Sequence, residues 1–284
     1  MIKDWIGEYN AKNTEEVLSA LREIMQEVAL AGLSRTDFFE RAAFYGGTAL
    51  RIFYGLDRFS EDLDFSLLEA DLDFSLEPYF EAIVTEFESI GMKVSIREKE
   101  KKEVSNIDSA FLKSETEWRE LVLEDFVKQT GIKSTNKGMR IKIEVDRKPP
   151  VGFNTELKLL TRPFSFYVKC FDKPSLFAEK MHALLFRKWK NRVKGRDWYD
   201  LEWYIKKGIP LDVHHFMLRA KDTGDWNRNN INTDDIIRLL REKIETVSFD
   251  AIKNDVVPFI KDDTTLKIWD RQYFNDLVDK LKFQ

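Results

Sequence analysis

Apolar and polar residues alternate with two different periods, one in each half of the chain. In the first half, short apolar stretches with a period of two predict strands, and these are Ala43–Tyr45, Asp62–Leu67, Met92–Arg97, Asn106–Leu112 and Arg140–Val145. Two helical patterns accompany them, at Thr14–Gly32 and at Glu77–Ile90. Strands that alternate with helices predict an α+β fold with a mixed sheet.

Helical patterns dominate the second half. They cover Ser175–Trp189, Asp197–Lys207, Val213–Ala220, Thr233–Thr246, Phe249–Ile252 and Trp269–Leu281. We expect a C-terminal helical bundle, with the divide near Pro163–Pro174, and hence two domains at residues 1–168 and 169–284. Thr130–Lys137 is expected to be an exposed loop.

The most informative polar residues follow the first predicted strand. Gly46 and Gly47 let the backbone turn tightly and approach a ligand, and Thr48 can cap the next helix, whose free N–H groups suit a phosphate. Asp62 and Asp64 alternate with apolar residues, so both carboxylates would leave the same side of a strand. Two hard oxygen ligands opposite such a turn suit Mg²⁺ and a nucleoside triphosphate.

Each half of this pattern also has a plain structural explanation. Gly-Gly pairs usually only make turns, and Asp-x-Asp alone is common on a solvated strand face. Their order, and the apolar residues on both sides, favour a nucleotide site over surface decoration. A P-loop is disfavoured because no Gly-Lys-Ser/Thr follows the glycines.

A third acidic position lies on the predicted strand Arg140–Val145. Its apolar residues alternate with charged ones, so Lys142, Glu144 and Asp146 share a face. Glu144 is mid-strand and is the preferred third metal ligand, whereas Asp146 lies close to the strand end before Pro149. An edge strand with a charged outer face is the alternative.

Basic residues gather near the predicted helix Ser175–Trp189. Lys180 would neutralise triphosphate oxygens if it faced the carboxylates, although it could equally pair with an aspartate of the Asp-x-Asp pair or be solvated. The densest basic run of the chain follows, with Arg187, Lys188, Lys190, Arg192, Lys194 and Arg196. It could bind RNA phosphates or be a solvated link between helices. The net charge of −4 confines any RNA contact to a local patch.

These motifs resemble the DNA polymerase β-type nucleotidyltransferases, and within them the AbiEii/AbiGii toxin family, which includes the MenT-type toxins. The resemblance is carried, in family order, by Gly46–Leu50 with Arg58–Asp64, by Lys142–Glu144, by Lys180–Ala183 with Arg187, and by Lys194–Leu201. The residues after Gly208 carry no motif that we can match.

The resemblance implies a metal-dependent nucleotidyltransferase that uses an NTP and Mg²⁺, with Mn²⁺ as an alternative metal. It assigns the metal to Asp62, Asp64 and Glu144, the nucleotide to Gly46, Gly47, Thr48, Arg58, Ser60 and Lys180, and catalysis to Asp62, Asp64, Lys180 and Asp197. The helical bundle then completes the active site.

Several of these roles stay open in the sequence. Asp197 could orient Lys180 or Arg196 or assist the acceptor hydroxyl, and Asp200 could cap or pair locally. A turn-forming hydrogen bond is the alternative for Ser60.

The same resemblance implies the toxin of a bacterial toxin–antitoxin or abortive-infection system. MenT-like members add nucleotides to the tRNA 3′ end, and an AbiEi-like antitoxin would come from a neighbouring gene. A nucleotidyltransferase that modifies a small molecule or protein is one alternative, and a non-catalytic nucleotide- or RNA-binding module is another.

The composition bears on the cellular compartment and on metal binding. The single cysteine, Cys170, excludes an intrachain disulfide framework, and no long apolar run or signal pattern is present, so we expect a cytoplasmic protein without a membrane partner. The three histidines lack zinc-ligand spacing with a cysteine.

Overall fold

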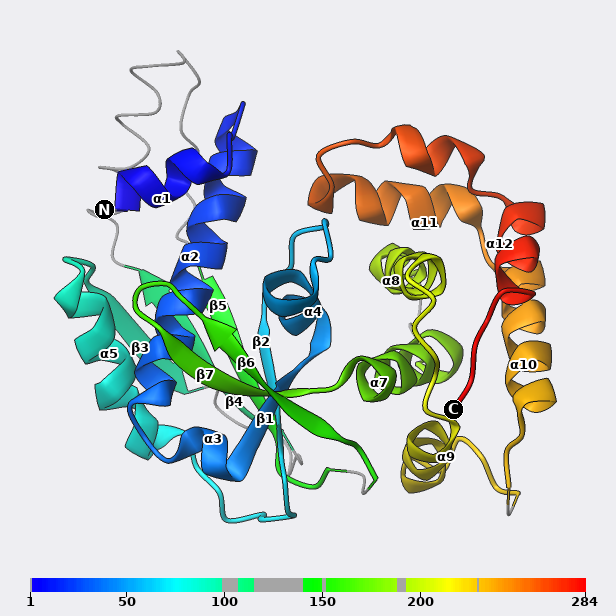
Figure 1. Cartoon of the computed structure of the whole chain (residues 1–284), viewed down its shortest axis with the longest axis horizontal. Coiled ribbons are helices and arrows are strands. Elements are labelled where there is room, and N and C mark those ends of the chain that lie inside the picture. The colour runs from blue at the N-terminus through cyan, green and yellow to red at the C-terminus, as the bar shows by residue number, and fades with distance from the viewer. Residues whose placement is uncertain (1, 99–106, 115–139, 150–151, 188–192, 229) are drawn as a thin grey trace. The chain divides into compact units, whose positions relative to one another are not determined.

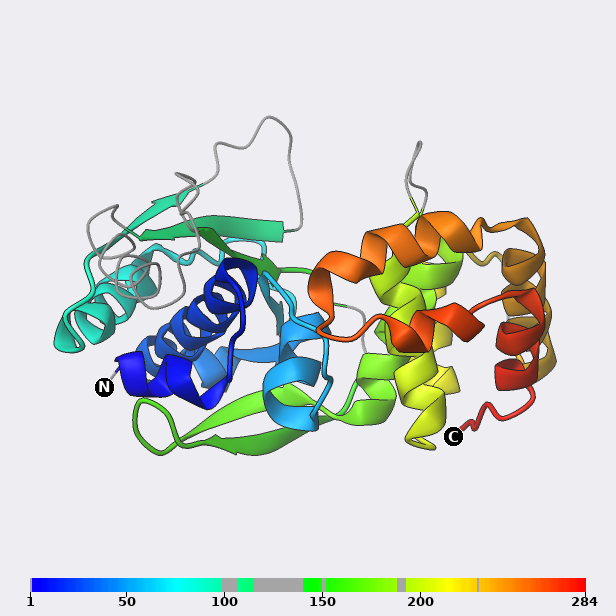
Figure 2. The same cartoon turned by 90° about the horizontal axis from the view of Figure 1, so that it is seen from above.

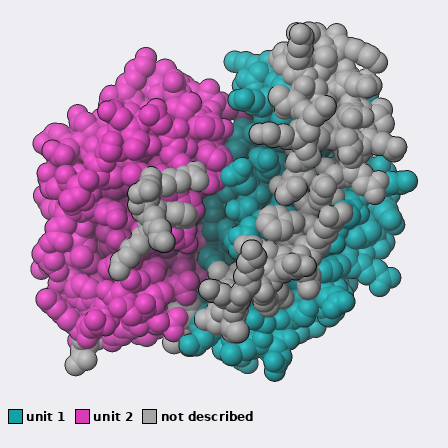
Figure 3. Space-filling view, turned by 180° about the vertical axis from the view of Figure 1, so that it is seen from behind, with its two compact units in different colours: residues 1–53, 59–149, 157–170 teal, residues 54–58, 150–156, 171–284 magenta. Residues whose placement is uncertain are grey.

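The computed structural model describes residues 2–98, 107–114, 140–149, 152–187, 193–228 and 230–284. The chain forms two compact units, coloured separately in Figure 3. The sheet unit comprises residues 1–53, 59–149 and 157–170, and the helical unit comprises residues 54–58, 150–156 and 171–284. The loop expected at Thr130–Lys137 lies outside the described residues.

A mixed sheet is built from seven strands of the described chain, in the order β3-β4-β5-β2-β1-β7-β6. The strands are β1 (Ala42–Tyr45), β2 (Leu63–Leu67), β3 (Val94–Glu98), β4 (Ile107–Ser114), β5 (Arg140–Asp146), β6 (Thr155–Leu160) and β7 (Phe166–Phe171). β1 pairs antiparallel with β2 and parallel with β7, and β2 pairs parallel with β5. The predicted mixed sheet with helices is confirmed.

The sequence prediction missed β6, which lies just before the expected divide at Pro163–Pro174, and β7, which lies within it. In β7, buried Phe166, Val168 and Cys170 alternate with more exposed residues, which is a strand pattern. In β6 the alternation points outward, since Leu157 and Leu159 are 62% and 51% exposed. Because its alternating leucines face outward, the apolar positions of β6 do not mark a face that packs against the core, and the strand was not predicted.

Aromatic packing fixes the centre of the sheet unit. The ring of Phe65 on β2 contacts those of Phe44 on β1 and Phe38, with centroid distances of 5.1 and 4.9 Å. All three are fully buried, and each contributes roughly 1.5–3 kcal/mol through burial. The helices of this part are α1 (Ile2–Glu8), α2 (Thr14–Ser34), α3 (Phe38–Arg41), α4 (Gly46–Tyr54), the 3₁₀ turn Glu77–Tyr79 and α5 (Phe80–Ser89).

The long helix α2 packs side by side with α5 (Figures 1 and 2). The two helices come close at Gly32, where a Cβ atom would lie 2.6 Å from the Cα of Ile83. Because that neighbour is backbone, it cannot turn aside as a side chain could. A glycine is therefore needed for the two helices to approach this closely.

The helical unit contains α7 (Lys173–Phe186), α8 (Gly195–Lys206), α9 (Val213–Asp222), α10 (Thr233–Thr246), α11 (Phe249–Val256), two 3₁₀ turns at Val257–Phe259 and Thr264–Ile268, and α12 (Arg271–Val278). The predicted helical bundle is confirmed. Stacking of Phe177 on Tyr204, with centroids 4.3 Å apart, joins α7 to α8, and α10 and α12 lie side by side (Figure 1).

Two details of the predicted helices were wrong. α7 begins at Lys173, where the Asp172 side chain accepts a hydrogen bond from the Ser175 N–H, so Pro174 lies in the first turn and does not precede the helix. The helix also ends at Phe186, earlier than expected. None of the helices in the described ranges is long and apolar enough to cross a membrane.

We expect Gly32→Ala to destabilise the protein by about 1–3 kcal/mol, because the added methyl group overpacks α2 against the α5 backbone. The matched control is Gly7→Ala in α1, where a Cβ would meet no atom within 4 Å. Urea unfolding should show a lower midpoint for the first variant only. Equal midpoints would contradict the close approach at Gly32.

Candidate active site

The glycine turn and the second aspartate of Asp-x-Asp meet in the sheet unit. β1 ends at Tyr45 and α4 begins at Gly46, whose φ of +82° is readily adopted only by glycine. Since β2 runs antiparallel to β1, Asp64 pairs with Tyr45 at this same end of the sheet. A Cβ on Gly46 would lie 2.5 Å from Oδ2 of Asp64, so the carboxylate occupies the space that a side chain there would fill.

Glu144 joins the same row of the sheet. The parallel pairing of β2 with β5 sets Asp64 opposite Glu144, and residues in register on paired strands point to the same face. Both side chains are partly exposed, and the Glu144 carboxylate forms an ion pair with Lys142. Asp146 is instead buried and accepts a hydrogen bond from the Lys148 N–H.

Asp62 does not lie on the strand as expected. β2 begins at Leu63, so Asp62 immediately precedes it. Thr48 holds this position in place, because its buried hydroxyl donates to the backbone carbonyl of Asp62. The expected helix cap at Thr48 is therefore wrong: α4 starts two residues earlier, and the hydroxyl supports the acidic segment.

Carboxylates of the kind that bind a divalent metal lie near the glycine turn. In the part of the chain that the structure describes, no three His, Cys, Asp or Glu side chains converge as a ligand group. Asp64 and Glu144 nonetheless share a face beside the glycine turn, and their hard oxygen atoms are the donors that Mg²⁺ prefers. The donor set fits such an ion, with Asp62 next to it in sequence.

Two further residues of the first motif support the fold around this site. Ser60 accepts a hydrogen bond from Nε2 of Gln26 through its backbone carbonyl, at 3.2 Å, and its hydroxyl bonds to no described residue. Arg51 contacts Glu23 at 2.8 Å and lies over the Phe59 ring. The turn-forming bond expected of the Ser60 side chain is not seen among the described residues.

The helical unit carries its own charged centre. Arg58, only 1% exposed, donates from Nε and Nη2 to the two oxygens of Asp200, each at 2.6 Å. Asp200 is fully buried and also lies 2.9 Å from Nζ of Lys180. Burial alone would raise the pKa of Asp200, but the Arg58 and Lys180 charges outweigh it and lower this pKa to about 2.

Lys180 thus pairs within the helical unit, with acids of α8. Its ammonium lies 3.6 Å from Oδ1 of Asp197, one turn before Asp200. The i, i+3 spacing of Asp197 and Asp200 places both on one helix face, which is the signal that could have identified Asp200 from the sequence. The sequence alone predicted only a local role for Asp200.

Part of the basic run lies around the start of α8. Lys194 immediately precedes the helix, and burial together with nearby cations lowers its pKa to about 8. Arg196 lies over the Phe259 ring at 4.0 Å, and Arg187 follows the last residue of α7. Lys188, Lys190 and Arg192 lie outside the described residues.

α8 begins at Gly195, which lies close against α11. Its N–H donates to Asp255 at 2.9 Å, and a Cβ atom there would lie 2.1 Å from the carbonyl oxygen of Ile252. This contact with α11 fixes the first turn of α8, and with it Asp197.

Residues 28–280 match the sequence profile of a known protein family. That family is described as nucleotidyl transferase AbiEii toxin, type IV toxin–antitoxin system. Comparison with curated protein sequences gave no significant match. Among solved structures, a candidate nucleotidyltransferase from H. pylori is 18% identical with a TM-score of 0.50, covering 92% of this chain and 91% of that chain. JHP933 from Helicobacter pylori is 16% identical with a TM-score of 0.48, covering 92% and 88%. The former supports the overall fold.

We expect Asp200→Asn to destabilise the protein by about 3–5 kcal/mol at neutral pH, because it removes the negative charge that accepts two hydrogen bonds from the buried Arg58 guanidinium. Asp279→Asn is the control, since Arg241 also contacts Asp279 at 2.6 Å but both side chains are exposed. The control should cost less than about 1 kcal/mol. The measurement is urea unfolding of both variants.

The pH dependence of the free energy of unfolding provides a second test of the Arg58–Asp200 ion pair. The folded-state pKa of Asp200 is depressed to about 2, so its stabilisation is complete above the unfolded value near 4. It is lost as the pH falls from about 4 towards 2. The gap between wild type and Asp200→Asn should narrow over that window, and a constant gap would contradict the ion pair.

Proposed function

The chain belongs to the AbiEii family of nucleotidyl transferase toxins of type IV toxin–antitoxin systems, and on this premise we propose that it transfers a nucleoside monophosphate from an NTP to the 3′ end of tRNA with Mg²⁺. One observation carries the assignment of the site. Asp64 lies against the Gly46 turn at the start of α4, and Glu144 is in register with Asp64 on the neighbouring strand.

In this proposal the sheet unit binds the triphosphate and the metal. Backbone N–H groups at Gly46 and Gly47 receive phosphate oxygens at the start of α4, and Thr48 keeps the Asp62 segment in place through its bond to the backbone. Asp62, Asp64 and Glu144 would hold the divalent ion. When bound, such an ion stabilises the attacking and leaving oxygens of an in-line displacement at phosphorus.

The helical unit supplies a lysine with a set orientation. Lys180 would neutralise charge on the triphosphate, and its position is maintained by Asp200 at 2.9 Å. We assign Arg58 to this support and not to direct contact with the nucleotide, because it is 1% exposed and donates two bonds to Asp200. Asp197 would then act on the acceptor hydroxyl.

The acceptor assignment rests on family membership and on the basic run that includes Arg187, Lys194 and Arg196. A cytoplasmic toxin that modifies tRNA would block translation, and an AbiEi-like antitoxin would restrain it. A small molecule or a protein remains the competing acceptor, because these reactions would use the same metal site.

We expect label from one of the four NTPs to appear on tRNA when the protein is incubated with Mg²⁺ and total bacterial tRNA. The double variant Asp62→Ala/Asp64→Ala should lower the rate by at least about 100-fold, because the metal loses two ligands. Denaturing gels measure the label on tRNA. Activity retained in the double variant would overturn the metal site.

A second variant separates RNA from other acceptors. Neutralising Lys188, Lys190 and Arg192 together should reduce labelling of tRNA if the basic run binds RNA phosphates. If turnover is unchanged in this variant and the label appears on a small molecule or a protein, then that molecule is the acceptor and tRNA is not.

We also expect Mg²⁺ with the correct NTP to raise the melting temperature. Without metal the carboxylates repel one another, and a ligand at 100 times its Kd adds about 2.7 kcal/mol of stability. Asp64→Ala should abolish most of the shift. No shift with any of the four NTPs at saturating Mg²⁺ would argue against the site.

A further inference from the structure

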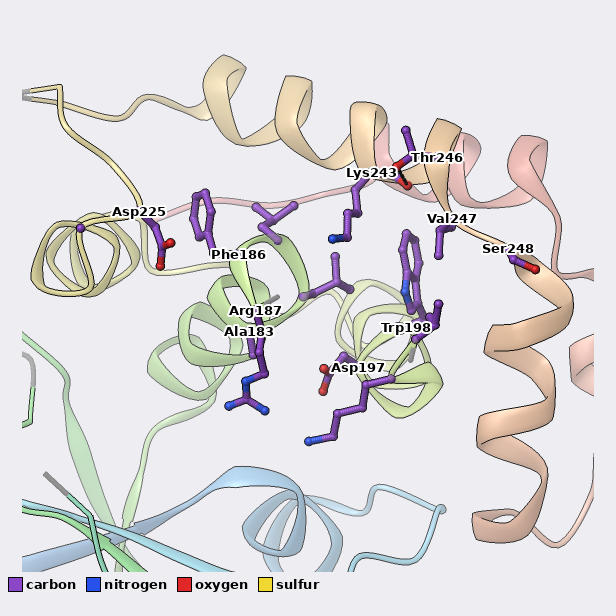
Figure 4. Close-up of a pocket in the computed structure, with 15 residues that line it drawn as sticks. Ala183, Phe186, Arg187, Asp197, Trp198, Asp225, Lys243, Thr246, Val247 and Ser248 are labelled. Atoms are coloured by element: carbon purple, nitrogen blue, oxygen red, sulfur yellow. Dashed lines mark hydrogen bonds between the residues drawn. The ribbon is translucent and has the colours of Figure 1, made fainter. Parts of the chain in front are cut away.

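A cavity of about 820 Å³ lies within the helical unit, next to Asp197. Its walls come from α7, α8 and α10, and from short segments that include Asp225 and Ser248 (Figure 4). Leu184, Phe186 and Trp198 contribute apolar surface. The volume is in the range of pockets that bind small molecules and cofactors, roughly 300–1,000 Å³.

Lys243 is the first feature that points to a ligand. It lies on α10, beyond every motif that the sequence analysis used, and its side chain extends into the cavity (Figure 4). It is half-buried, yet its ammonium pairs with no carboxylate among the described residues. A lysine in such a position is available to an anion.

Asp197 is the second feature, and it comes from the opposite wall. The side chain is 4% exposed, and its Oδ1 accepts no hydrogen bond from the residues that the structure describes. Lys180 approaches this atom only to 3.6 Å. A buried carboxylate oxygen without a donor favours a ligand that brings an O–H or N–H group.

The charge of the lining favours a phosphate over a neutral or basic ligand. Arg187, Lys194 and Lys243 line the cavity together with two acids, Asp197 and Asp225. Asp225 already accepts a 2.6 Å bond from Thr223, so it is satisfied within the protein. The excess of cations would be neutralised by one phosphate group.

The lowered pKa of Lys194 is consistent with a bound phosphate. Its pKa is lowered to about 8 by burial and by cations that include Lys180 and Arg187. A bound anion would lessen that repulsion and favour the charged lysine.

We propose that this cavity holds the 3′-terminal nucleotide of the acceptor strand, with its phosphate on Lys243, Arg187 and Lys194 and its ribose hydroxyl on Oδ1 of Asp197. This assignment deepens the proposed function and rests on it in taking the acceptor to be RNA. In the transfer, the hydroxyl oxygen bonds to the α-phosphorus of the NTP, the bond from that phosphorus to pyrophosphate breaks, and the hydroxyl proton passes to Asp197.

The test is RNA binding in the absence of Mg²⁺ and NTP, so that it does not depend on turnover. The probe is a 5′-fluorescein RNA hexamer that ends in CCA with a free 3′-hydroxyl, and fluorescence anisotropy gives its Kd. We expect Lys243→Gln to raise this Kd about tenfold, as for loss of one charged hydrogen bond. The control is Lys280→Gln, which removes one exposed charge near the C-terminus and should leave the Kd within about twofold.

Further arms separate the possible results. A hexamer that ends in a 3′-phosphate should bind more weakly to wild type, because it offers Asp197 no 3′-hydroxyl and places negative charge beside the carboxylate. Equal Kd values for Lys243→Gln and Lys280→Gln, with both variants as stable as wild type, would overturn the proposal. AMP that binds as tightly as the hexamer and depends equally on Lys243 would also overturn it, and would make the cavity a free-nucleotide site.

Failure of the cavity assignment can be told apart from failure of the proposed nucleotidyl transfer to tRNA. If no label reaches tRNA but hexamer binding still depends on Lys243, the cavity assignment stands and the nucleotidyl transfer to tRNA does not. If label reaches tRNA equally in both variants and binding is unchanged, the transfer stands and the cavity assignment fails.

Discussion

The buried contact between Arg58 and Asp200 is the interaction on which the charged centre of the helical unit depends. Removing a guanidinium and a carboxylate from water costs several kcal/mol for each ion, and only good geometry with further hydrogen bonds offsets it. Two 2.6 Å bonds and the nearby Lys180 ammonium supply that compensation. Lys180 lies closer to Asp200 than to Asp197, and Oδ1 of Asp197 accepts no hydrogen bond from the described residues.

A different constraint organises the sheet unit. Strand register alone aligns Tyr45, Asp64 and Glu144 across β1, β2 and β5, and a shift of one residue would send every side chain of the shifted strand to the opposite face. The left-handed backbone at Gly46 then brings the helix start against Asp64. The strand register sets the positions of Asp64 and Glu144. The lack of a Cβ atom on Gly46 allows the turn to come close to Asp64.

Local patterns in the sequence predicted most of this arrangement. Periods of two and of 3.6 residues predicted the sheet and the helical bundle. The glycine turn and the alternating acids pointed to Gly46, Asp64 and Glu144, and the resemblance to the family favoured a nucleotide-binding role for Lys180. Partners far apart in the chain could not be derived in this way. Arg58 and Asp200 are 142 residues apart, and no local period indicates that one would neutralise the other.

Lys243 illustrates the same limit. Its helix has a clear amphipathic pattern, and from sequence alone a lysine there is one of many solvated charges. Only the packing of α10 near α7 turns that side chain towards a cavity shared with Asp197. Thr48 is a milder case, because its residue type suits a helix cap, while its actual partner is a carbonyl 14 residues away.

The separation of Arg58 from Asp200 also has a consequence for biosynthesis. Translation adds about 5–20 residues per second, so the 142 intervening residues take roughly 7–28 s to make. During that interval the guanidinium has been made and its carboxylate does not yet exist. The nascent sheet unit can begin to collapse in this time, while the charged centre of the helical unit closes only after α8 has emerged. A ribosome that stalls before Asp200 therefore releases a fragment without the pair that supports Lys180.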